Sequence, residues 1–206
     1  FSYRSLSLSF LIDASVGGSI FSNTNKTGKY TGVLANTLSG RDAEHGGLWY
    51  YTAAMGNNVR LPESPSYSVS SDGLYYAQVN GQSTRVYQDG IMVEGVTESG
   101  SKNEEVVSAE KYYHRIYSIA EANVYDASYV KLREVALSYR LPRLWTQKLH
   151  LQEASVTLTG RNLWTIYKSV PNIDPESALT TGNAQGVEAY SLPTTRSFGV
   201  NLSVKF

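Results

Sequence analysis

Strict alternation of apolar and polar residues in four separate segments constrains the fold of this chain most. The last of these segments runs from Arg196 to Phe206, with apolar side chains at every second position from Phe198 onward. Comparable segments lie near 3–13, 129–141 and 154–164. Because successive side chains of a strand point to opposite faces, each segment is predicted to be a strand with one apolar and one polar face.

The composition favours an all-β chain. The 206 residues include 16 Tyr, 17 Gly and no Cys, with 18 basic against 18 acidic residues. A neutral balance offers no attraction to nucleic acid, and the lack of Cys excludes a disulfide framework. No apolar run approaches the roughly 18 to 20 residues of a membrane-spanning helix, and no secretory signal opens the chain. We therefore expect either a cytosolic protein or a chain that begins inside a longer product.

The connections between the four predicted strands are very unequal in length. Residues 142–153 form a short link with room for one helical turn, whereas 21–128 and 165–196 are long and rich in Gly, Ser, Asn and Tyr. In an ordinary compact domain, structureless loops of that size would argue against the strand assignment. Outer-membrane β-barrels combine short periplasmic turns with long extracellular loops, so the pattern favours a barrel.

Strand length and charge placement agree with this interpretation. Each segment reaches the about 9 to 11 residues that a tilted strand needs to cross an outer membrane. A slip in the alternation between Leu132 and Val135 predicts a β-bulge. Charged residues on the predicted polar faces are Asp13, Glu134, Arg140, Arg161 and Lys205. We assign the remaining basic residues to strand ends: Arg4, Lys131, Arg133 and Arg196. A soluble β-sandwich also alternates in this way, and four strands alone cannot close a barrel.

Longer stretches of the sequence point to a family. The residues D-A-S-Y-V-K-L-R-E-V-A-L-S-Y-R-L-P (126–142), L-T-G-R-N-L-W-T-I-Y (158–167), D-P-E (174–176) and the closing L-P-T-T-R-S-F-G-V-N-L-S-V-K-F resemble the carboxyl-terminal barrel segment of SusC/RagA-type TonB-dependent outer-membrane transporters. Near the start, S-L-S-L-S-F-L-I-D and G-V-L-A-N-T-L-S-G-R-D (32–42) are similar to the preceding segment of that family.

The resemblance implies an architecture and a set of partners. Residues 1–206 would supply the last four antiparallel strands of a transmembrane β-barrel of about 22 strands, with the plug domain and TonB box outside this chain. The implied partners are the rest of the barrel and plug, outer-membrane lipid, a SusD-like lipoprotein lid and the TonB–ExbB–ExbD complex. Such pairs import oligosaccharides or peptides across the outer membrane of Bacteroidetes. The terminal Phe206 would then be read as a barrel assembly signal.

The candidate functional residues are aromatic or lumen-facing rather than catalytic. The three histidines are scattered and no phosphate-binding loop or nucleophile motif is present, so we expect no enzyme activity, metal or cofactor. Aromatic residues expected to contact ligand, the lid or other loops are Trp49, Tyr50, Tyr51, Tyr75, Tyr76, Tyr112 and Tyr113. Lumen-facing polar residues are expected to be Glu134, Arg140, Arg161 and Lys205, with Glu134 and Arg161 forming an ion pair.

Several functions remain open at this point. The leading hypothesis is part of a transporter for nutrient oligosaccharides, and the same transporter class could import peptides instead. An oligomeric structural pore, in which several chains each donate four strands, is an alternative of a different class. A soluble carbohydrate-binding β-sandwich is another.

Overall fold

The computed structural model describes residues 1–62, 65–148, 150–177, 182 and 185–206. The chain forms two compact units, which we call the sheet unit (1–24 and 124–206) and the insert unit (25–123). Strands dominate both, in agreement with the all-β prediction, and helices are few and short. None of the helices in the described ranges is long and apolar enough to cross a membrane.

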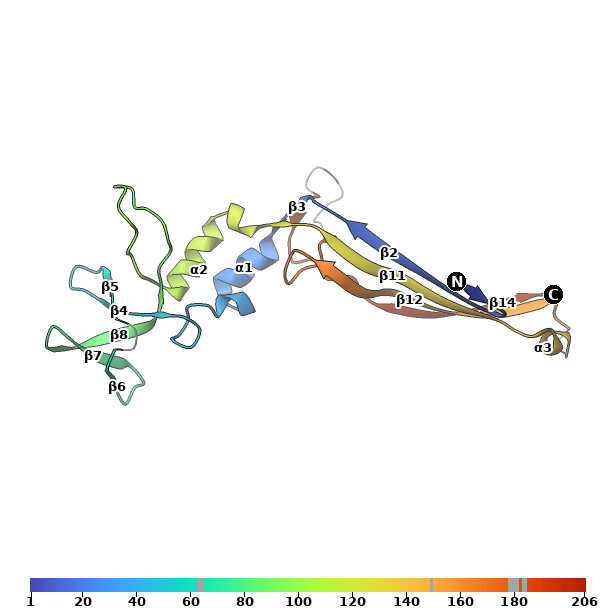
Figure 1. Cartoon of the computed structure of the whole chain (residues 1–206), viewed down its shortest axis with the longest axis horizontal. Helices are drawn as coiled ribbons and strands as arrows, with labels where there is room; N and C mark the ends of the chain where they lie inside the picture. The colour runs from blue at the N-terminus through green and yellow to red at the C-terminus, as the bar shows by residue number, and fades with distance from the viewer. Residues whose placement is uncertain (63–64, 149, 178–181, 183–184) are drawn as a thin grey trace. The chain divides into compact units, whose positions relative to one another are not determined.

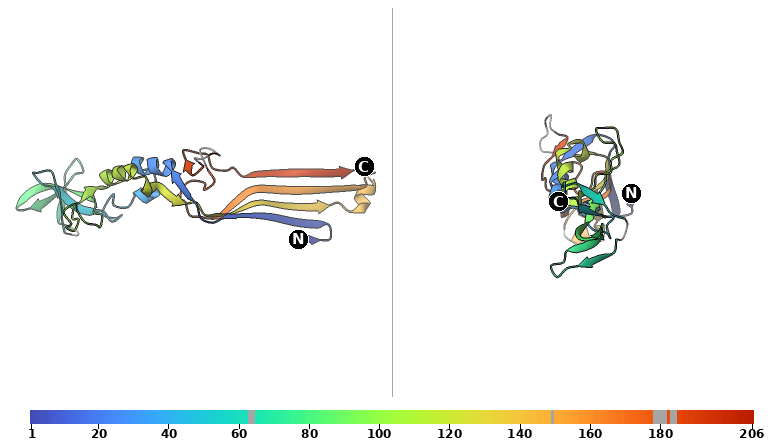
Figure 2. Two further views of the ribbon diagram at one scale, coloured as in Figure 1. Left: turned by 90° about the horizontal axis from the view of Figure 1, so that it is seen from above. Right: turned by 90° about the vertical axis from the view of Figure 1, so that its left-hand side faces the viewer.

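One long antiparallel sheet dominates the sheet unit. Its strands, in spatial order, are β1 (Ser2–Tyr3), β2 (Leu6–Ser15), β11 (Tyr129–Arg140), β12 (Glu153–Lys168) and β14 (Ser197–Lys205). The four long strands correspond to the four alternating segments and lie side by side in Figure 2. Both chain ends lie toward the α3 end of this sheet (Figure 1), where α3 (Arg143–Lys148) joins β11 to β12.

The register of this sheet shifts at the predicted place. The pairing of β11 with β2 and with β12 breaks between Leu132 and Glu134, which confirms the expected irregularity and leaves Arg133 as the unpaired residue. Strand β12 continues to Lys168, beyond the predicted end near 164, because Tyr167 and Lys168 still pair with Val130 and Tyr129.

A small second sheet stands at the other end of the sheet unit. It consists of β10 (Val124–Asp126), β3 (Ser19–Ser22) and β13 (Val187–Glu188), with β13 parallel to β3. Ile20, Val170 and Ile173 are buried together beside it. These contacts tie the chain that follows β12 to the chain that follows β2.

The segment expected as a long loop between the first two predicted strands has its own secondary structure. Its helices and helical turns are α1 (Asn23–Thr31), η1 (Ala35–Thr37), α2 (Ala109–Ser118) and η2 (Glu121–Asn123). Its strands are β4 (Leu48–Thr52), β5 (Asn58–Arg60), β6 (Tyr67–Val69), β7 (Tyr75–Val79), β8 (Gln82–Ile91) and β9 (Val107–Ser108).

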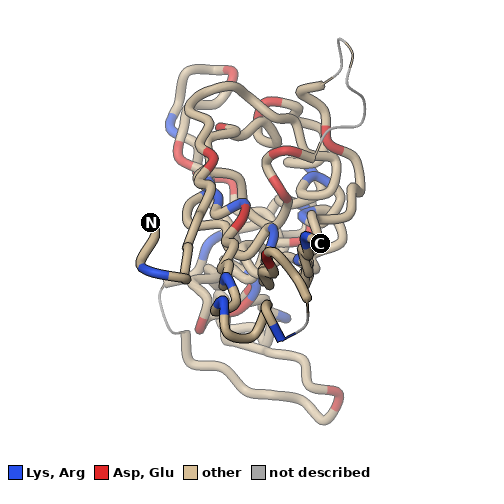
Figure 3. The backbone as a smooth tube through the Cα atoms, turned by 90° about the vertical axis from the view of Figure 1, so that its right-hand side faces the viewer, with Lys and Arg blue, Asp and Glu red and all other residues tan. Residues whose placement is uncertain are grey.

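Local sequence signals explain much of the insert unit. Asn80 and Gly81 both have positive φ angles between β7 and β8, as the two-residue hairpin turn of an Asn-Gly pair requires. Ser108 caps α2 by accepting a hydrogen bond from Lys111 N. Trp49, Ala77 and Val86 form a buried core in its sheet. Basic and acidic residues are interspersed along the chain, as Figure 3 shows.

Candidate functional site

The long sheet has one apolar face whose residues line up from strand to strand. The paired rows across β2, β11, β12 and β14 are Leu6, Tyr139, Val156, Leu202; Leu8, Leu137, Leu158, Val200; and Phe10, Val135, Gly160, Phe198. Much of this face is open: Phe198 is 80% exposed, Val200 73% and Leu158 51%. Soluble monomers rarely expose a continuous apolar area of this extent, so this face is built for contact with an apolar environment.

The opposite face of the same sheet is polar. Its paired rows are Ser7, Ser138, Thr157, Asn201 and Ser9, Ala136, Thr159, Gly199. The Ser138 and Thr157 hydroxyl oxygens lie 2.7 Å apart and share a hydrogen bond. Leu11 is an exception, since it lies opposite Glu134 and is 59% exposed. A sheet with one apolar and one hydrated face can separate lipid from water.

Three of the four residues predicted to face a lumen form ion pairs on the polar face: Glu134, Arg140 and Arg161. Arg161 Nε lies 2.9 Å from Glu134 Oε2, so the expected pair is present. Arg140 Nε lies 2.9 Å from Glu153 Oε1, and Lys205 pairs with Glu153 in the strand ladder. Exposed pairs of this kind are each worth about 0 to 1 kcal/mol. Phe206 follows the end of β14 and is 84% exposed.

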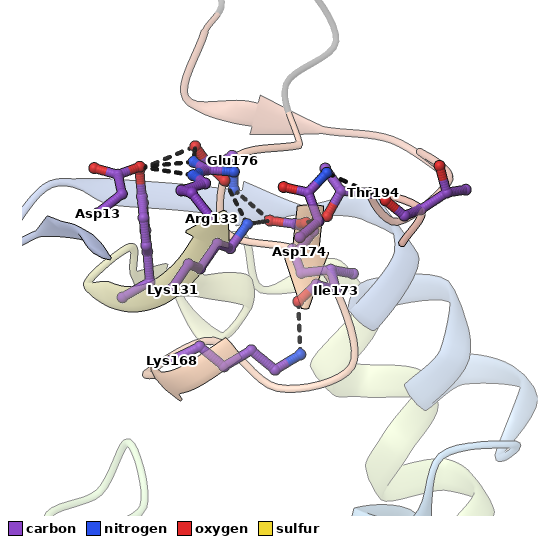
Figure 4. A network of polar contacts seen from close by, with 11 residues as sticks. Asp13, Lys131, Arg133, Lys168, Ile173, Asp174, Glu176 and Thr194 are labelled. Carbon is purple, nitrogen blue, oxygen red and sulfur yellow. Dashed lines mark hydrogen bonds and ion pairs between the residues drawn. The ribbon is translucent and has the colours of Figure 1, made fainter. Parts of the chain in front are cut away.

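The bulge of β11 organises a second, more buried set of charges, which we call the bulge network: Lys131 and Arg133 with Asp13, Asp174 and Glu176 (Figure 4). Lys131 Nζ lies 2.5 Å from Asp174 Oδ1 and also contacts Glu176. Arg133 donates to Asp13 Oδ2 from Nε at 3.0 Å and from Nη2 at 2.7 Å, and also contacts Glu176. A bulge changes the direction of side chains, which lets both cations reach Glu176.

This network corrects the assignment of Lys131 and Arg133 to the ends of a strand. Both lie inside β11, and their charges are matched by carboxylates rather than by water at a strand end. The signal in the sequence was the D-P-E stretch at 174–176, which supplies two of the three carboxylates. Its pairing with residues more than 40 positions earlier could not be read from the sequence, because it depends on the strand register.

Burial and neighbours act in opposite directions on the Asp174 carboxyl. Burial raises its pKa, but hydrogen bonds from Lys131, from Glu176 N and from the Thr194 hydroxyl lower the pKa to about 2. Burial likewise raises the pKa of Glu176, but hydrogen bonds from Lys131 and Arg133 outweigh it and lower that pKa below its ordinary value. The carboxylates therefore stay charged at neutral pH and fix the chain at 174–176 against β11.

A second carboxylate fixes the next part of this connection. Glu188 is fully buried and accepts hydrogen bonds from Ser22 Oγ at 2.7 Å, from Thr24 Oγ1 at 2.5 Å and from Ser191 N at 3.1 Å. Although burial raises the pKa of Glu188, these hydrogen bonds lower it below its ordinary value. Together with the bulge network, Glu188 holds both ends of the stretch between Asp174 and Ser191.

The predicted aromatic residues are divided between core and surface of the insert unit. Trp49 and Tyr50 are 7% and 4% exposed. Trp49 stacks on Tyr67, with ring centroids 4.9 Å apart, and the Tyr50 hydroxyl donates to Asp89 at 3.2 Å. These contacts favour loop packing for the two residues. Tyr51, Tyr75 and Tyr76 are half-buried in the same sheet.

Tyr112 and Tyr113 lie on α2 with their rings in an edge-to-face contact at 5.1 Å. The Tyr113 hydroxyl donates to the backbone carbonyls of Asn36 at 3.1 Å and Ser39 at 2.9 Å. It therefore anchors η1 and the turn after it to α2. Contact of any of the seven aromatic residues with a ligand or lid stays a prediction.

The described residues offer no constellation for a metal. Among them, no group of three or more His, Cys, Asp or Glu side chains comes close enough to hold an ion. His45 Nδ1 pairs with Asp42 Oδ1 at 2.7 Å on the surface, which orients the imidazole beside one carboxylate.

Comparison with known proteins provides one informative relative. The chain is similar to a TonB-dependent receptor. That protein, TonB-dependent receptor P3 of Formosa agariphila, is 34% identical over 94 residues, which cover 43% of this chain and 9% of the relative. The chain thus matches only a small part of the length of that relative. No family model matches the sequence.

Proposed function

We propose that this chain forms the last four strands of the β-barrel of a SusC-like TonB-dependent transporter in the bacterial outer membrane. The observation that carries the proposal is the apolar face of the long sheet, continuous from β2 to β14 and exposed along its length. In the proposal this face contacts lipid and the polar face lines the barrel. Similarity to a named TonB-dependent receptor supports it independently.

The sheet edges support a larger barrel. Strand β14 ends the strand order on one side. On the other side, the described part of the chain covers β2 only from Leu6 to Ser7, where β1 pairs with it, and at Leu8, which exchanges backbone hydrogen bonds with Phe1. Unpaired backbone groups are costly in lipid, at several kcal/mol each. Strands from the remainder of the same protein would satisfy both edges.

In this proposal the transporter imports nutrient oligosaccharides with a SusD-like lipoprotein, and TonB–ExbB–ExbD drives it through the plug. The insert unit and the 169–196 connection then belong to the extracellular side, because they join the ends of strands opposite α3. No bond needs to be made or broken by these strands.

Spin labels at adjacent positions test the membrane assignment. Leu8→Cys and Ser9→Cys, each made in a Cys-free background of the full-length protein, place a label on the apolar and the polar face of β2. We expect dissolved oxygen, which concentrates in lipid, to speed the spin relaxation of the label at position 8. A water-soluble nickel complex should speed the spin relaxation of the label at position 9. Equal access of the nickel complex to both positions would favour a soluble β-sandwich.

The composition of the detergent-extracted particle tests the rest of the proposal. A transporter predicts that this sequence belongs to a longer polypeptide with a plug, and that a lipoprotein co-purifies. A particle made only of copies of the 206-residue chain would point to an oligomeric pore. Uptake of labelled oligosaccharides or of peptides by cells that carry the gene, compared with a deletion strain, then identifies the class of nutrient.

A further inference from the structure

The insert unit contains a polar cavity that the barrel proposal does not use. Its volume is about 410 Å³, within the range of roughly 300 to 1,000 Å³ typical of small-ligand sites. The walls come from the end of α1 with Gly32 after it, from the turn that follows η1, from one residue of β8 and from the first two turns of α2. The side chains used in the argument below are Tyr30, Arg41, Asp89, Glu110 and His114.

One wall is aromatic. The rings of Tyr30 and His114 stack at 4.1 Å with an interplanar angle of 17°, and Tyr30 is 45% exposed. Tyr30 also contacts Tyr117 at 5.0 Å, so its ring is held by two residues of α2. A fixed, partly exposed ring offers an apolar surface to the C–H groups of a ligand and a hydroxyl to its polar groups.

Arg41 is held rigidly at the cavity. Its Nε donates to Thr37 O at 2.8 Å, and its Nη2 donates to Gly32 O at 2.7 Å and to Thr37 Oγ1 at 3.2 Å. Gly32 permits this position, since a Cβ atom there would lie 1.9 Å from Arg41 Nη2. Within the described ranges, Nη1 has no partner. The guanidinium therefore presents a preorganised donor.

Two carboxylates share the cavity without pairing to Arg41. Asp89 accepts one hydrogen bond, from Tyr50 OH to Oδ1, and Glu110 accepts none from the residues that the structure describes. Lys29, the other basic residue of the lining, donates to Ala122 O at 2.8 Å and to Asn123 Oδ1 at 3.2 Å. The lining thus carries two basic and two acidic side chains, and both donors and acceptors remain open.

We propose that this cavity binds a neutral saccharide residue. A hydroxyl group both donates and accepts, so vicinal hydroxyls can satisfy Arg41 together with Asp89 and Glu110. An anionic ligand would meet the two carboxylates, and an apolar ligand would leave all of these groups unpaired. Extended peptides are commonly held along an open strand edge, whereas these walls come mainly from helix ends and a turn. The inference rests on the proposed function, because it places a subsite for the imported glycan in the insert unit.

The test uses the full-length protein and a panel of neutral gluco-, manno-, galacto- and xylo-oligosaccharides. Affinities are measured by titration calorimetry for the wild type, Glu110→Gln, Asp89→Asn and the control Glu121→Gln. Glu110 is exposed and has no described partner to lose, so its variant should fold normally. Glu121 is also an exposed carboxylate of the insert unit, in η2 and outside the cavity.

We expect each cavity variant to weaken the best oligosaccharide about tenfold or more, as the loss of a charged hydrogen bond predicts, and the control to leave affinity unchanged. Hydroxyl-radical footprinting should show protection of Tyr30 by that oligosaccharide. Unchanged affinity in both cavity variants, with Tyr30 unprotected, overturns the saccharide site while the transporter stands. Binding and uptake of peptides but of no saccharide overturns the site as well. Absence of any uptake that depends on the gene overturns the proposed function itself.

Discussion

Lys131 Nζ lies 2.5 Å from Asp174 Oδ1, and the two side chains are only 5% and 8% exposed. This pair connects the bulge of β11 to the chain that follows β12. Its burial distinguishes it from the surface pairs on the same sheet, such as Arg140 with Glu153 at 71% and 49% exposure. The two pairs should therefore respond very differently to mutation.

Removing the buried cation should destabilise the protein strongly. Lys131→Met leaves Asp174 charged and buried, which costs about 3 to 5 kcal/mol in comparable pairs. We expect a matching fall in the free energy of unfolding in detergent micelles and faster hydrogen exchange over residues 169–176. Arg140→Gln, the control, should change the free energy by about 1 kcal/mol or less. Equal losses in both variants would show that burial of the network does not matter.

Acid should weaken the attachment of residues 174–176 to β11. Because the folded-state pKa of Asp174, about 2, lies below its ordinary value of 3.8, the unfolded state binds more protons in acid. This stabilisation is fully present above about pH 5 and is lost progressively as the pH falls through about 2. Glu176 and Glu188 shift in the same direction. Hydrogen exchange of residues 169–176 at pH 5, 3 and 2 measures the loss.

Asp174→Asn provides the comparison for the acid experiment. It removes the titrating carboxylate and should leave a smaller pH dependence over the same range, since Glu176 and Glu188 still contribute. An unchanged acid profile in this variant would contradict the assignment of the effect to Asp174.

Neighbouring residues on β14 should differ sharply in their tolerance of a positive charge. Val200 lies in an apolar row and Asn201 in a polar row, and both side chains are exposed. Val200→Arg places a charge against lipid, at a cost of about 2 to 4 kcal/mol near mid-depth, whereas Asn201→Arg keeps it hydrated. The measurement is the unfolding free energy of the folded protein in lipid vesicles. The membrane assignment fails if Asn201→Arg is the more destabilising substitution.

Close packing around Gly47 of the insert unit predicts that a larger residue there will destabilise the protein. A Cβ atom at Gly47 would lie 2.1 Å from Gln88 O, whereas at Gly95 it would meet nothing within 4 Å. Gly47→Ala forces the backbone apart and should cost about 1 to 3 kcal/mol. Gly95→Ala should be close to neutral. Limited proteolysis of residues 25–123 in the full-length protein compares the two variants.

The sequence by itself determined the four long strands of the sheet unit and their two faces. Alternation of the kind seen from Phe198 to Phe206 is a local property, because side-chain direction along a strand repeats every two residues. The same regularity revealed the bulge near Arg133, since a single extra residue shifts the phase of the pattern. The ion pair of Glu134 with Arg161 was predicted because both residues lie on the polar faces of neighbouring strands.

Only the tertiary structure decided which distant residues meet. The contact of Lys131 with Asp174, the enclosure of Glu188 by Ser22 and Thr24, and the cavity around Arg41 join segments separated by many residues in the sequence. The sheet of the insert unit escaped prediction for a related reason. Its strands are short, and burial of Trp49 with Val86, rather than local alternation, selects their pairing. Packing depends on many residues that the fold brings together, so it cannot be predicted from a periodic pattern along the chain.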